Sequence, residues 1–93
     1  MVAMIEDELI HWWKDDAGEQ HRTILRLESE GPQVINNFPR DGRVVVRLVN
    51  RVGSQAMKLS PEEALRVSTQ MMSIAKELLN QKRDLWKKSD DNP

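Results

Sequence analysis

The stretch that decides the fold is GRVVVRLVNRVGSQAMKLSPEEALRVSTQMMSIAKELL, residues 42–79. Its first part, residues 43–52, has the period-two pattern of a half-buried strand: one side is aliphatic, with Val44, Val46, Leu48 and Val52, and the other mixes bases with valines, at Arg43, Val45, Arg47, Val49 and Arg51. Gly53-Ser54 predicts a tight turn, and residues 55–59 then predict a returning strand. Because parallel strands need a long crossover, these short links favour antiparallel pairing.

A helix start follows directly on the returning strand. Ser60 is a suitable N-cap, Pro61 suits the first helical position, and Glu63 completes a capping box. The apolar periodicity that follows predicts a helix over residues 61–88, roughly 40 Å long at ~1.5 Å per residue.

Upstream of this stretch, the sequence predicts a strand, a short second strand and a short helix. Residues 21–28 alternate in the manner of a strand, Val34-Ile35 favours a short second strand, and residues 36–42 are rich in turn formers. Residues 3–14 place their large apolar side chains at helical spacing, and Gly18 is a plausible C-cap, so we expect a helix there.

These elements predict an α+β fold. An antiparallel three- to four-stranded sheet would pack on the long C-terminal helix, with the short N-terminal helix beside it. We expect one domain over residues 1–88 and a disordered tail over residues 89–93. The chain has no Cys, which excludes disulfides, thiolate zinc sites and cysteine nucleophiles. It has no signal-like or membrane-spanning apolar run, so we expect a cytoplasmic protein without membrane partners.

The apolar arc of the predicted helix is wider than one partner surface requires. Two neighbouring stripes cover roughly 180°, against the ~100° that packing on one surface needs. We therefore expect a homodimer or higher oligomer that forms through residues 61–88, with coiled-coil packing. The expected interface residues are Val67, Met71, Ile74, Leu78 and Leu85. The alternative is a monomer in which the N-terminal helix, with Trp12 and Trp13, covers the second stripe.

Charge is distributed unevenly along the chain. The net charge is −1, yet residues 1–20 hold six acids and one base, whereas residues 21–58 hold seven bases and three acids. If the strands share one sheet, one face carries six bases among Ile24, Val45 and Val49, and no acid is expected on it. The six bases are Arg22, Arg26, Arg43, Arg47, Arg51 and Lys58.

Such a face predicts contact with a single-stranded nucleic acid. Guanidinium groups bind phosphates, and apolar or aromatic side chains between them accept bases. The stacking candidates are Trp12, Trp13 and Phe38. The alternative is a solvated sheet surface that pairs with acids of residues 6–19 or with a protein partner.

Catalysis is not indicated by the sequence, and we expect no enzyme and no cofactor. No nucleophile motif or glycine-rich phosphate loop is present. Asp7, His11 and Asp15 would share one side of the N-terminal helix, but such an exposed stripe is usually solvated, so no metal site is predicted.

The order of strands, a Ser-Pro-Glu-Glu helix start and a long C-terminal helix resembles two families of single-stranded nucleic-acid-binding proteins. These are the archaeal ThermoDBP and ThermoDBP-related family and the eukaryotic positive-cofactor-four coactivator family, and the likeness extends over residues 21–88. The resemblance implies single-stranded DNA or RNA as partner, bound with little sequence preference by sheet arginines and nearby aromatics. The alternative function is that of an oligomeric protein–protein adaptor, or of a small regulatory protein such as viruses encode, that uses the same face.

Overall fold

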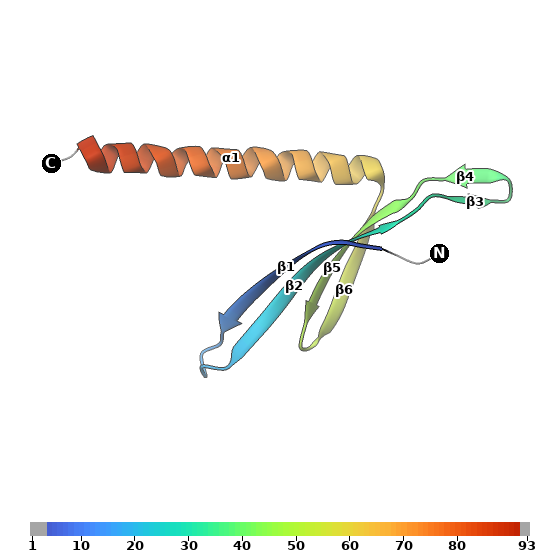
Figure 1. Cartoon of the computed structure of the whole chain (residues 1–93), viewed down its shortest axis with the longest axis horizontal. Coiled ribbons are helices and arrows are strands. Elements are labelled where there is room, and N and C mark those ends of the chain that lie inside the picture. Colours follow the sequence, from blue (N-terminus) through green and yellow to red (C-terminus); the bar gives the residue numbers. More distant parts are fainter. Residues whose placement is uncertain (1–3, 92–93) are drawn as a thin grey trace. The chain divides into compact units, whose positions relative to one another are not determined.

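Six strands precede one helix in a computed structural model that describes residues 4–91, with side chains through Lys88. The strands are β1 (Met4–Lys14), β2 (Gln20–Glu30), β3 (Gln33–Ile35), β4 (Phe38–Arg40), β5 (Arg43–Asn50) and β6 (Gly53–Leu59). The helix is α1 (Pro61–Asp91). The α+β class is therefore confirmed (Figure 1). The strands and α1 form two separate compact units that divide after Glu63, and we describe each by itself.

The strand unit holds two antiparallel sheets. The larger has the order β1-β2-β5-β6, and the smaller pairs β3 with β4. In the larger sheet, Ile10 pairs with Ile24, Ile24 with Val49, and Val45 with Lys58. Figure 1 shows β3 and β4 continuing beyond the ends of β2 and β5 as a separate hairpin arm.

The N-terminal helix predicted over residues 3–14 is wrong: residues 4–14 form β1, and residue 3 lies outside the described residues. The cause is the loop that follows. Gly18, with φ of 83°, donates a hydrogen bond from its N–H to the carbonyl oxygen of Asp15. The N–H of Asp15 donates across the loop to the carbonyl oxygen of Glu19. A glycine with positive φ serves a three-residue hairpin loop as well as a helix C-cap. Here it closes the β1–β2 hairpin, so the apolar residues of β1 lie on a strand.

Two other hairpin loops differ slightly from their predicted positions. The β5–β6 turn lies at Arg51-Val52, where the Asn50 side chain accepts the N–H groups of Val52 and Gly53. The predicted turn over residues 36–42 contains β4, which pairs with β3 across Asn36-Asn37. Both asparagines have positive φ, 51° and 66°, as a type I′ hairpin turn requires.

The pleat of the larger sheet separates two faces, which we name by their most frequent residues. The Arg face carries Glu8, Ile10, Trp12, Arg22, Ile24, Arg26, Glu28, Glu30, Arg43, Val45, Arg47, Val49, Ala56 and Lys58. The Leu face carries Leu9, His11, Trp13, Thr23, Leu25, Leu27, Val44, Val46, Leu48, Gln55, Met57 and Leu59.

The core of the larger sheet lies on the Arg face. Val45 is 1% exposed and Ile24 8%, and the carboxylate-bearing Glu28 is also buried. On the Leu face, by contrast, Leu9, Leu48 and Met57 are exposed. We expected that face to pack on the long helix, and this packing remains a prediction.

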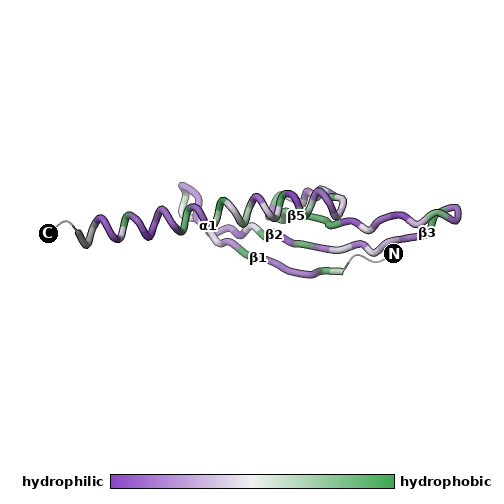
Figure 2. The backbone as a smooth tube through the Cα atoms, turned by 90° about the horizontal axis from the view of Figure 1, so that it is seen from above, coloured by the Kyte–Doolittle hydropathy of each residue, from purple (hydrophilic) through white to green (hydrophobic). Residues whose placement is uncertain are grey.

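The helix starts where the sequence predicted. Ser60 Oγ accepts the Glu63 N–H, and Glu63 Oε1 accepts the Ser60 N–H in return, which is a capping box. The helix runs to Asp91, three residues beyond its predicted end, and residues 92–93 of the expected tail lie outside the described residues. Hydrophobic and hydrophilic segments alternate along it (Figure 2). It is not long and apolar enough to cross a membrane, and it is the one helix of residues 4–91.

Candidate nucleic-acid interface

The Arg face carries five of the six expected bases, and acids accompany them, whereas Arg51 lies in the β5–β6 turn. Glu28 and Glu30 follow Arg26 by the same alternation along β2, and Glu8 stands opposite Arg26 on β1. The expectation of a face without acids is therefore wrong. Glu28 lies within the predicted strand, residues 21–28, and the same alternation that places Arg26 on this face places Glu28 there too, but the prediction did not count it. Glu30 lies beyond the predicted end of that strand, and Glu8 could not be placed on the sheet while its segment was assigned to a helix.

Four of the six predicted phosphate-binding bases are held in ion pairs. Arg26 Nε lies 2.7 Å from Glu8 Oε1, Arg47 Nε 3.1 Å from Glu28 Oε2, Arg51 Nη1 3.2 Å from Glu19 Oε2, and Lys58 Nζ 2.9 Å from Glu30 Oε1. Within the described part of the chain, Arg22 and Arg43 have no ion-pair partner.

The Arg47–Glu28 pair is the most enclosed of these. Arg47 donates two hydrogen bonds to the carboxylate, from Nε and from Nη2, at 3.1 and 3.3 Å. These bonds lower the pKa of Glu28 and raise the pKa of Arg47. A phosphate could reach Arg47 only by leaving a buried carboxylate without its partner, so Arg47 is a poor phosphate ligand.

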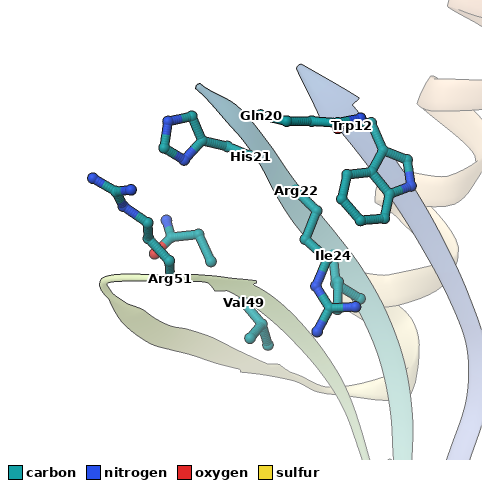
Figure 3. A pocket seen from close by; sticks show the side chains of 8 residues that line it. Trp12, Gln20, His21, Arg22, Ile24, Val49 and Arg51 are labelled. Carbon is teal, nitrogen blue, oxygen red and sulfur yellow. The ribbon is translucent and has the colours of Figure 1, made fainter. Parts of the chain in front are cut away.

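A hollow of about 290 Å³ lies at one end of the Arg face, between the β1–β2 and β5–β6 hairpins. Its lining residues are Trp12, Gln20, His21, Arg22, Ile24, Val49, Asn50 and Arg51. Figure 3 shows Trp12 of β1 and Arg51 of the β5–β6 turn on opposite sides of Arg22 and Ile24. Trp12 is 61% exposed, so its ring is open to a ligand. The hollow thus combines the aromatic ring of Trp12, the aliphatic side chains of Ile24 and Val49, and the guanidinium groups of Arg22 and Arg51.

A second hollow, of about 330 Å³, lies where the larger sheet meets the hairpin arm. Arg40 and Arg43 line it together with Gln33 and Ile35, but Glu30 and Asp41 line it as well. This hollow is therefore more balanced in charge than the first.

The other predicted aromatic contacts are not in the first hollow. Trp13 lies on the Leu face, where its ring packs against His21 with 4.6 Å between ring centroids, and its Nε1–H donates to Thr23 Oγ1. Phe38 lies on β4 in the hairpin arm. The structure therefore brings Trp12, Arg22 and Arg51 together, and it places Trp13 and Phe38 elsewhere.

The histidine group considered in the sequence is not assembled on a helix. Asp7 and His11 lie on β1 and Asp15 lies in the following turn. A different group comes together there: Asp15, Glu19 and His21, with one ligand atom of each within 4.8 Å of the others. The hydrogen bond with His21 and the backbone N–H of Glu19 lower the pKa of Asp15.

The predicted oligomer-interface residues all lie on α1 and are exposed: Val67, Met71, Ile74, Leu78 and Leu85. The second apolar stripe of the helix is also exposed, at Leu65, Met72, Leu79 and Trp86.

Comparisons with protein-family models, with curated proteins and with solved structures give no match to this chain.

Proposed function

We propose that this protein binds single-stranded DNA or RNA with little sequence preference, at the hollow formed by Trp12, Arg22 and Arg51. The observation that carries the proposal is an exposed indole beside a guanidinium, that of Arg22, which no carboxylate of the described chain neutralises. A base can stack on Trp12 while Arg22 binds the adjoining phosphate, and neither contact depends on base identity.

Arg51 is available as a second phosphate ligand. Its ion pair with Glu19 is exposed, with the two side chains 69% and 65% accessible. Exposed pairs of this kind contribute little to stability, so a phosphate can replace the carboxylate at small cost. Arg26, Arg47 and Lys58 differ, because each is held by an acid of the sheet. We therefore propose that they shape the face rather than bind phosphate.

A bound strand would follow β5 toward Arg43. Arg43 lies eight residues before Arg51, about 26 Å away at ~3.3 Å per residue of strand. It also has no ion-pair partner within the described residues. Three arginines at the two ends of the face would then bind phosphates, with the neutralised centre between them.

The test is an anisotropy titration of labelled oligo-dT and oligo-U across a salt series, with tryptophan emission recorded in parallel. Two to three phosphate contacts predict a slope of log K against log salt of about −1.4 to −2.1 for a single strand. Between 50 and 200 mM salt this amounts to a loss of roughly 7- to 18-fold in affinity. Trp12 should be quenched on binding. Absence of binding at low salt, with the protein folded, would refute the proposal.

A pair of variants tests the location. Arg22→Glu should abolish most of the binding and reduce the salt slope. Arg66→Glu makes the same charge change on α1 and should leave binding within twofold of wild type. If the two variants bind equally well, the hollow is not the site.

The second candidate function is an oligomeric protein–protein adaptor that uses the Arg face. The observation that favours it is that three carboxylates on this face pair with three of its five bases, which leaves less charge for a phosphate backbone. An adaptor with an apolar interface core should bind its partner with little dependence on salt, so the salt series above distinguishes the two functions.

We also propose that α1 associates with a second copy of the chain. Its exposed stripe, Val67 to Leu85, otherwise leaves a row of large aliphatic side chains in water. Sedimentation should give a mass of two or more chains, and Ile74→Glu should shift it to the monomer. Ser73→Glu, one residue away and off the stripe, is the matched control. A monomeric wild type at all concentrations would contradict this proposal.

A further inference from the structure

We infer that the β1–β2 hairpin end binds one divalent transition-metal ion of the zinc class, with Asp15, Glu19 and His21 as ligands. Their donor atoms lie within 4.8 Å of one another at the junction of the hairpin loop and β2. This inference concerns an ion site beside the hollow, and it stands whether or not the protein binds nucleic acid.

The donor set has the composition that such an ion prefers. One imidazole nitrogen and two carboxylate oxygens suit Zn²⁺ and its neighbours better than Mg²⁺ or Ca²⁺, which are bound by oxygen alone. Ligands of one tetrahedral zinc ion at about 2.0–2.1 Å stand roughly 3.4 Å apart. His21 Nε2 and Asp15 Oδ2 are 2.7 Å apart, so insertion of the ion requires them to separate by less than ~1 Å.

Two of the three ligands are already oriented. Asp15 Oδ1 accepts the backbone N–H groups of Ala17 and Glu19, both at 2.9 Å, which leaves Oδ2 directed at His21. The His21 side chain is only 8% exposed, and its ring packs against Trp13. Contacts that fix the ligands of a metal in this way reduce the cost of binding it.

The third ligand, Glu19, is exposed and has a competing partner. Its Oε2 is paired with Arg51 Nη1 at 3.2 Å, so an arriving cation meets a carboxylate that a guanidinium already partly neutralises. A hollow of about 280 Å³, lined by Asp15, His21 and Arg51 among others, gives the ion and its remaining water ligands access. The ion and Arg51 therefore compete for one carboxylate. Removal of Arg51 should strengthen metal binding.

The test is calorimetric titration of the full chain with Zn²⁺, with far-ultraviolet circular dichroism as the measure of folding. We expect one ion per chain, and a loss of at least tenfold in affinity in His21→Gln. The second histidine provides a matched control: His11 lies on β1 and belongs to no such cluster, so His11→Gln should bind as wild type does. Ni²⁺ should quench tryptophan emission in wild type and His11→Gln, because Trp13 packs on the ligand, but not in His21→Gln.

Two exposed positions keep the inference testable if His21→Gln fails to fold. Glu19→Gln should weaken Zn²⁺ binding, whereas Arg51→Ala should strengthen it by a few fold, a change that damage to the fold would not produce. The inference is overturned if wild type binds no Zn²⁺, if His11→Gln and His21→Gln lose affinity equally, or if Arg51→Ala weakens binding.

Discussion

Val45 offers the most direct test of where the sheet keeps its core. It stands between Glu28 of β2 and Lys58 of β6, beneath side chains that are engaged in ion pairs, and it is 1% exposed. Val45→Ala removes two methyl groups, which costs about 1.6 kcal/mol in transfer free energy, and the unfilled space raises the loss to about 2–3 kcal/mol. At roughly 4–8 °C per kcal/mol, a loss of 2 kcal/mol lowers Tm by about 8–16 °C.

The assay is urea and thermal unfolding at one fixed protein concentration, since association would shift both midpoints. Val52→Ala is the first control, because Val52 lies in the β5–β6 turn and is 90% exposed; its loss should stay below about 0.5 kcal/mol. Val46→Ala, on the same strand but on the Leu face, controls for strand propensity and should cost less than Val45→Ala. Equal losses at Val45 and Val46 would refute a core confined to the Arg face.

Three further predictions concern local features. Gly42→Ala should destabilise the protein by about 1–3 kcal/mol in urea unfolding, because a Cβ there would overlap the carbonyl oxygen of Glu30; full stability would contradict this crowding. Ser60→Ala should lower stability by about 1 kcal/mol and reduce helicity measured by circular dichroism, and Ser60→Thr should restore most of it. The hydrogen bond from Arg47 lowers the pKa of Glu28 in the folded protein. The ion pair therefore contributes its full stability above the ordinary glutamate pKa of 4.5, and this contribution is lost as the pH falls below that value. Glu28→Gln should flatten this part of the profile of unfolding free energy against pH.

The sequence was sufficient for the strands β5 and β6, though not for the position of the turn between them, and for the helix start, because each is determined by local chemistry. Alternation from Arg43 onward defines a strand without reference to the rest of the chain, and the Ser60 cap needs only residues within one turn. The helix prediction for the N-terminal segment was wrong because the structure of that segment depends on residues far from it in the sequence. Spacings of four, three and one between apolar residues fit a helix, whereas its partner strand is identified only through pairing with residues 20–29.

The sequence predicted which arginines share one face of the sheet, but not that acids neutralise several of them. Alternation placed Arg22, Arg26 and Arg47 on one face, and the register bears this out. It could not show that Arg26 is neutralised from β1, because that pairing joins residues eighteen positions apart. Nor could it separate Trp12 from Trp13: in a strand adjacent side chains lie on opposite faces, whereas in a helix they lie side by side.

The hairpin arm of β3 and β4 has a consequence for how the protein opens. Its backbone hydrogen bonds join only its own two strands, and its apolar side chains Val34, Ile35 and Phe38 are exposed. Two-stranded hairpins without a covering layer are marginally stable, so the arm should unfold locally while β2 and β5 stay paired. Its amide protons should exchange with solvent well before those of the larger sheet. Trypsin should cut first after Arg40, and the two fragments should remain associated through the pairing of β2 with β5.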